Sequence, residues 1–76
     1  MLKITSSYDM KIGDRFIEVP IYEEVWVVID VEVKAPGWKE GSYLCVEAQN
    51  EKTGRIAYFG HAEGCSGYVN DLYKVI

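Results

Sequence analysis

The sequence predicts an all-β protein, because helical periodicity is almost absent and period-two alternation recurs along the chain. The clearest case is "VWVVIDVEV" (25–33), in which β-branched residues occupy every second position. Glycine, proline and asparagine separate such segments at short intervals, as turns between strands require. At 76 residues the chain has room for one small domain, which we expect to span 1–76.

Each expected strand is bounded by a turn signal. "KIGDRFIEVP" (11–20) reads as a strand after a Gly13-Asp14 turn, and Pro20 ends it. The long 25–33 strand follows, and "KAPGWKEG" (34–41) reads as a loop. A hairpin comes next, in which "SYLCVEAQ" (42–49) and "RIAYFG" (55–60) are joined by "NEKTG", with Gly54 in a left-handed conformation.

The two ends of the chain complete the sheet. In "YVNDLYKVI" (68–76) we expect a tight 3-10 turn at 70–72 followed by a short last strand, and "LKIT" can add an edge strand. Alternation predicts twelve residues on the inner faces: Ile12, Phe16, Val25, Val27, Ile29, Val31, Leu44, Val46, Ile56, Tyr58, Leu72 and Val75.

Four segments together, "KIGDRF", "VWVVIDVEV", "YLCVEAQNEKTGRIAYF" and "NDLYKVI", resemble the small SH3-like barrels. The resemblance concerns architecture and covers most of the chain. It implies a five-stranded barrel with a short 3-10 turn before the last strand; an OB-like barrel or an open curled meander is the alternative. SH3-like barrels include peptide binders, nucleic-acid binders and methyl-lysine readers, so the resemblance leaves the function open.

The charge pattern favours a basic partner over nucleic acid. The formal net charge is −4, and five carboxylates with no base fall between Glu18 and Glu32. Lys3, Lys11 and Arg15 form one basic cluster, the basis of an alternative reading as a nucleic-acid or nucleotide binder. No apolar run is long enough for a membrane span, and two cysteines suit a cytoplasmic protein with reduced thiols.

The segment "HAEGCSGY" (61–68) gathers residue types that carry chemistry. Tyr68 stands where nucleophile motifs of the GxSxG kind require glycine, and a His61–Cys65 pair lacks an evident orienting group. A metal site would draw on His61, Cys65, Cys45 and Glu63, without the paired short spacings of structural zinc. We therefore expect no enzyme activity, no metal and no cofactor, and a glycine-rich connector before the last turn.

The candidate binding surface is acidic and aromatic. Strand parity puts Trp26 opposite the valine face, with Asp30 and Glu32, and with Tyr43 on a neighbouring strand. Glu23 and Glu24 extend this strip, and Trp38 stands in the longest loop. Aromatic anchors rimmed by carboxylates suit a basic protein or peptide. The competing readings bury Trp26 beneath the N-terminal segment and fold Trp38 over a barrel end.

These features predict a non-catalytic protein-binding module. A small, acidic, aromatic-rich chain suits a stoichiometric inhibitor or adaptor, of the kind that phages and other mobile elements direct against host proteins. An exposed barrel edge would also allow a homodimer. A small metal-binding or Cys/His hydrolytic protein is the third class, and it depends on His61 and Cys65.

Overall fold

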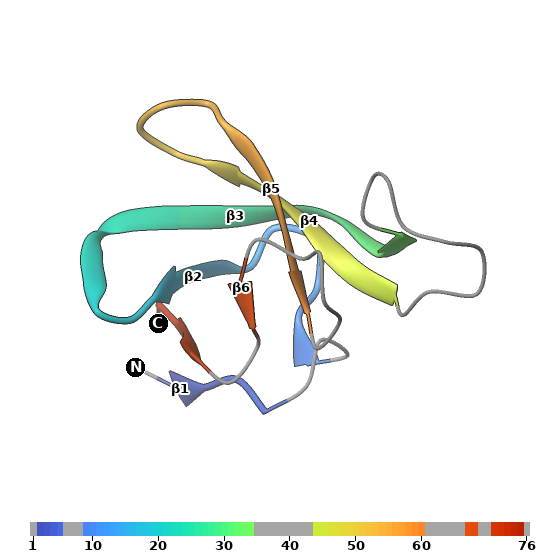
Figure 1. The fold of residues 1–76 in the computed structure, drawn as a ribbon, viewed down its shortest axis with the longest axis horizontal. Helices are drawn as coiled ribbons and strands as arrows, with labels where there is room; N and C mark the ends of the chain where they lie inside the picture. Colours follow the sequence, from blue (N-terminus) through green and yellow to red (C-terminus); the bar gives the residue numbers. More distant parts are fainter. Residues whose placement is uncertain (1, 6–8, 35–43, 61–66, 69–70, 76) are drawn as a thin grey trace.

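The chain forms an all-β structure, as predicted. The computed structural model describes residues 2–5, 9–34, 44–60, 67–68 and 71–75, and these contain no α-helix. Figure 1 shows the path of the chain. The strands are β1 (Leu2–Lys3), β2 (Arg15–Glu18), β3 (Ile21–Lys34), β4 (Leu44–Asn50), β5 (Ile56–Gly60), β6 (Gly67–Tyr68) and β7 (Leu72–Lys74).

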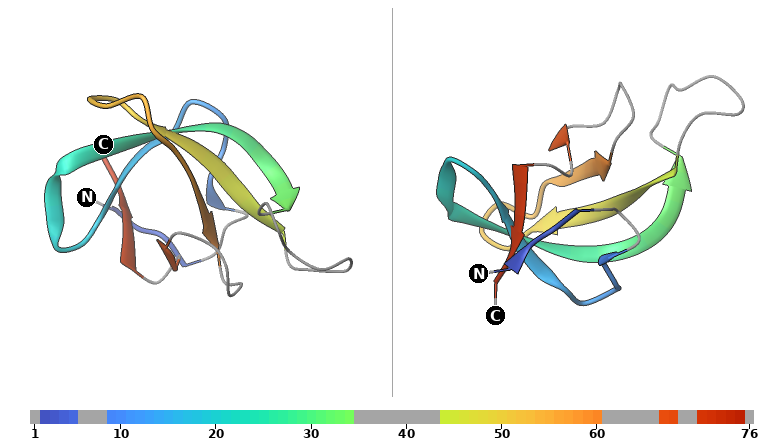
Figure 2. Two further views of the ribbon diagram at one scale, coloured as in Figure 1. Left: turned by 45° about the horizontal axis from the view of Figure 1, so that its top comes forward. Right: turned by 90° about the horizontal axis from the view of Figure 1, so that it is seen from below.

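All seven strands belong to one sheet in the order β1-β7-β2-β3-β4-β5-β6. Neighbours are antiparallel except β5 and β6, which are parallel. The sheet curls strongly (Figure 2), but no pairing among the described residues joins β1 to β6, so it is not closed. The predicted count of five strands is therefore wrong: β1 is added at one edge, and the expected connector contributes β6 at the other.

Polar side chains and glycines hold the turns. Asn50 is 1% exposed, and its Oδ1 accepts hydrogen bonds from the amides of Lys52 (2.9 Å) and Thr53 (3.0 Å). Its carbonyl accepts from the Gly54 amide at 2.9 Å. Gly54 has a φ of 77°, which confirms the predicted β4–β5 hairpin turn. At the other end, Asp71 has 3-10 geometry directly before β7, where a 3-10 turn was expected.

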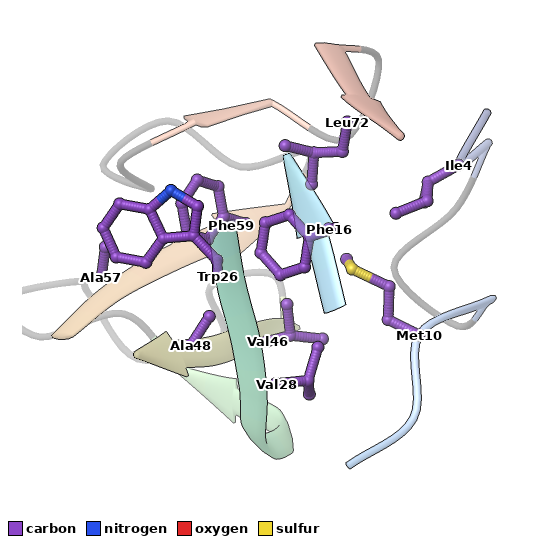
Figure 3. Packing of buried hydrophobic residues seen from close by; sticks show 10 residues of the cluster. All are labelled: Ile4, Met10, Phe16, Trp26, Val28, Val46, Ala48, Ala57, Phe59 and Leu72. Carbon is purple, nitrogen blue, oxygen red and sulfur yellow. The ribbon is translucent and has the colours of Figure 1, made fainter. Parts of the chain in front are cut away.

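The core lies inside the curl of the sheet and is built around three rings (Figure 3). Phe16 and Phe59 meet edge to face with centroids 5.0 Å apart, and Trp26 and Phe59 do so at 5.1 Å. Such pairs add to the stabilisation from burial alone. The cluster of buried residues comprises Ile4, Met10, Phe16, Trp26, Val28, Val46, Ala48, Ala57, Phe59 and Leu72.

The predicted inner face is only partly correct. Phe16, Val46 and Leu72 are fully buried, and Val31 packs against the core. Ile12, Ile29 and Ile56 are exposed instead, so their assignment to the inner face is wrong. The half-buried residues of the set are Val25, Val27, Tyr58 and Val75. The side chain of Leu44 lies outside the described set.

Two bulges change the alternation along β3. Its partners on β4 run Val28↔Ala48, Asp30↔Glu47 and Val33↔Cys45, so β3 has one extra residue in each interval. Each extra residue reverses the side to which the following side chains point. Before the first bulge Trp26 and Val28 point inward, on the face opposite to the predicted one, and after it Val31 reaches the core.

The error in β5 has a different cause. Ala57 and Phe59 point inward, and Ile56 and Tyr58 point outward. Phe59 has no polar atom to satisfy, whereas the Tyr58 hydroxyl needs a partner. Partial burial and the adjacent Glu47 carboxylate, which pairs with Tyr58 across the strands, raise the pKa of Tyr58. The more apolar of the two faces is therefore the buried one.

Glu32, beside the second bulge, has a φ of 56°, a left-handed conformation that costs an L-residue about 1–2 kcal/mol. Glycine adopts it freely and valine does not. Glu32→Gly should therefore be more stable than Glu32→Val by about 1–2 kcal/mol, measured by urea unfolding followed by tryptophan fluorescence.

The control is Gln49, an exposed residue of β4 that is paired on both sides. There the order should reverse, with Gln49→Val more stable than Gln49→Gly, since both variants lose the same side-chain bond to the Gly54 carbonyl. If valine is the more stable substitution at both positions, the left-handed bulge at Glu32 is wrong.

Candidate binding surface and pocket

The turn between β2 and β3 carries an exposed apolar and acidic surface. Phe16 pairs with Trp26 and Glu18 with Ile21, so one residue of β2 stands opposite four of β3. The surplus residues cannot pair with β2, and they widen the turn. Ile21 and Tyr22 are 41% and 59% exposed. We call this surface the acidic turn, formed by Glu18, Ile21, Tyr22, Glu23, Glu24 and Asp71.

Three carboxylates of the acidic turn come from different segments: Glu18 from β2, Glu24 from β3 and Asp71 from the 3-10 residue before β7. β7 pairs with β2 so that Glu18 stands opposite Leu72, and the Val19 amide donates to the Asp71 carbonyl at 2.9 Å. Burial raises the pKa of Glu18 above its ordinary value, and the nearby charges of Asp71 and Glu24 raise it further. Within the described part of the chain, none of the three carboxylates forms a salt bridge.

A pocket of about 330 Å³ opens beside Glu18. Its floor is Trp26, and the Arg55 guanidinium lies over this ring, 5.3 Å from the centroid. Phe59, Ala57 and Ile56 complete the lining. The pocket thus combines aromatic and aliphatic side chains with one acid and one base.

The predicted strip along β3 does not form one surface. Trp26 is 3% exposed, so its assignment to an outer face is wrong: the indole belongs to the core. Glu23 and Glu24 lie at the acidic turn, whereas Asp30 and Glu32 are exposed at the far end of β3. Six to nine strand residues separate the two groups, about 20–30 Å when extended. Trp38 and Tyr43 lie outside the described residues.

Sequence patterns gave no sign of Asp71 and Arg55 as site residues. Asp71 reaches the acidic turn only through the β2–β7 pairing, which joins segments more than fifty positions apart. The sequence predicts Arg55 as the first residue of a strand. One pattern could have indicated its place in the site: Arg55, Ala57 and Phe59 alternate, so Arg55 is expected on the same side as an inward Phe59.

The predicted basic cluster is divided. Lys3 and Lys11 line a second pocket, of about 460 Å³, together with Lys74. Lys3 lies over the Tyr73 ring at 5.1 Å, and Lys74 is bound to Asp14 at 3.2 Å. Arg15 is not part of this pocket: it forms two bonds with Glu51, at 2.7 and 2.9 Å. Arg15 and Lys74 are thus paired with carboxylates among the described residues.

The residues proposed for chemistry lie mostly outside the described part. His61, Glu63 and Cys65 are among residues 61–66, which are not described. Cys45 is a buried thiol that donates to the Val33 carbonyl at 3.3 Å. Among the described residues, no three metal-binding side chains stand close enough to hold an ion. That same part of the chain has no helix of the length and apolar character needed to cross a membrane.

Comparison with known proteins adds no assignment. No family model matches the chain, and no curated protein or solved structure is significantly similar to it. The acidic turn and the pocket are therefore the features of this molecule that bear on its function.

The raised pKa of Glu18 predicts a pH effect on stability. Its ionised form is less favourable in the folded than in the unfolded chain, so its contribution is best at low pH. Stability falls as the pH rises through the unfolded pKa, about 4.3, towards the higher folded value. Glu18→Gln should therefore raise the melting temperature at pH 7, and the gain should vanish below pH 4. Glu23→Gln on the same turn is the control, and an equal gain there would contradict this cause.

Proposed function

We propose that this protein is a non-catalytic protein-binding module whose acidic turn contacts a basic surface of its partner. The observation that carries this proposal is the cluster of Glu18, Glu24 and Asp71, which lacks a salt bridge within the described chain, beside the exposed Ile21 and Tyr22. Apolar and aromatic side chains supply buried area in an interface, and complementary charge speeds association and selects the partner.

The proposal includes the mode of action. A chain with this small a core suits a stoichiometric inhibitor or adaptor, and the combination of size, acidity and aromatic content is what favours a phage-type inhibitor of a host protein. The partner it implies presents lysine or arginine around a shallow apolar depression that Tyr22 can enter. The same charge pattern disfavours nucleic acid at this surface, because phosphates would face three carboxylates.

The proposed fold is an SH3-like barrel. Its support is the antiparallel meander β2-β3-β4-β5, with β7 returning to pair with β2, and a 3-10 residue before that last strand. In this reading, β1 and β6 are additions at the two edges. The acidic turn is then the connection between the first two strands of the barrel.

Affinity capture from host extract tests the binding surface. Tyr22→Ala combined with Glu24→Lys should lower recovery of the specific partner at least tenfold, because it removes an apolar anchor and reverses a charge. The melting temperature should change little, since both side chains lie at the surface. Added salt should weaken capture by the unmodified protein.

The matched control is Glu32→Lys, a charge reversal at the far end of β3. It should leave capture unchanged if the acidic turn is the binding surface. Loss of capture in this variant and not in the double variant would place the surface at the other end of β3 and contradict the proposal.

A nucleic-acid binder is the second candidate, favoured by the Lys3, Lys11 and Lys74 pocket. It requires salt-sensitive binding of labelled oligonucleotides that Lys3→Gln with Lys11→Gln abolishes. Such binding, together with unchanged capture by the acidic-turn double variant, would replace the protein-binding proposal.

A further inference from the structure

The 330 Å³ pocket is lined by residues of β2, β3 and β5 and by Arg55, an exposed residue directly before β5. Glu18 follows Phe16 two positions along β2, and Arg55 precedes Ala57 by the same interval. Glu18 and Arg55 both line the pocket with Trp26, and no salt bridge joins them in the described structure.

Trp26 holds a polar atom that has no hydrogen-bond partner among the described residues. The residue is 3% exposed, and its Nε1–H makes no hydrogen bond within the described chain. Buried tryptophan N–H groups normally have a partner, because an unpaired buried donor costs about 1–3 kcal/mol. Figure 3 shows the nitrogen on the edge of the ring turned away from Ala48. An acceptor other than the described residues would satisfy it.

Arg55 offers a second set of donors at the same place. Its guanidinium lies over the Trp26 ring, 5.3 Å from the centroid, and forms no salt bridge in the described structure. A guanidinium carries several N–H donors. A carboxylate can accept from a guanidinium and from an indole N–H, and charge-assisted bonds of this kind are the stronger ones.

Glu18 limits the charge that a ligand of this pocket can carry. A simple anion in the pocket would be repelled by this carboxylate and by Glu24 and Asp71 near it. A ligand that carries both a cationic group and a carboxylate can pair with Glu18 through the first and with Arg55 through the second. The side chains of Ile56, Ala57 and Phe59 add an apolar wall, and the volume is at the small end for ligand sites.

We propose that this pocket binds a free α-amino acid with an aliphatic side chain. Its carboxylate lies against Arg55 and the Trp26 indole N–H, its ammonium group faces Glu18, and its side chain contacts Phe59 and Ala57. The site shares Glu18 with the acidic turn, but the ligand needs neither Tyr22 nor Ile21, so the two proposals are tested by different variants. Either proposal can fail while the other stands.

Nuclear magnetic resonance titration of the full chain with L-leucine tests the site. The indole N–H resonance of Trp26, identified by its loss in Trp26→Phe, should shift saturably. N-acetyl-L-leucine lacks the ammonium group and L-leucinamide lacks the carboxylate, so each should bind at least tenfold more weakly. No shift with leucine, or equal binding of the acetylated compound, as expected of a site for a chain terminus, would overturn the proposal.

Variants separate the pocket from a general charge effect. Arg55→Gln, at an exposed position, should weaken leucine binding at least tenfold by calorimetry, since it removes one charged donor. Trp26→Phe should also weaken it, with Ala57 amide shifts showing that the fold is kept. Lys52→Gln removes a cation from the same hairpin outside the pocket and should have no effect. Equal weakening by Lys52→Gln would reject the site.

Discussion

The burial of Trp26 on the concave face is the constraint on which the rest of the structure depends. The indole is the largest side chain in the core, and it fits because the neighbouring strands present alanine: Ala48 on β4 and Ala57 on β5, which pair with each other. Phe59 then contacts both Trp26 and Phe16, which joins β2, β3 and β5 through one set of rings. A slip of one residue in β3 would expose the indole and bury Ile29, so the register is strongly specified.

The same constraint creates the pocket. Because Phe16 and Trp26 point inward, the next inward position on β2 is Glu18, and because Phe59 points inward, the corresponding position at the hairpin end is Arg55. Glu18 cannot be moved to the outer face without reversing β2, whereas Arg55 is exposed and lies just outside β5. An acid and a base therefore line the pocket together with Trp26, next to the buried core.

Strand positions and turns were predictable because they depend on local chemistry: glycine at positive φ in the β4–β5 turn and proline after β2 are visible in the sequence. The orientation of β3 was not. Both faces of "VWVVIDVEV" are apolar near Trp26, so alternation alone does not choose between them, and the two bulges break it further along. The space for the indole comes from Ala48 and Ala57. These small residues are not recognisable as core residues in the sequence before Trp26 is known to point inward. The cluster of Glu18, Glu24 and Asp71 likewise needs the β2–β7 pairing.

The charged side chains differ in whether they are paired with an opposite charge among the described residues. Arg15 with Glu51, and Lys74 with Asp14, are paired at the surface, and backbone hydrogen bonding together with Lys74 lowers the pKa of Asp14. Glu18 has the opposite surroundings: partial burial and two like charges, with no salt bridge in the described chain. Perturbed carboxylates occur more often at functional sites than elsewhere. The proposed basic partner would supply the cation that Glu18 lacks among the described residues.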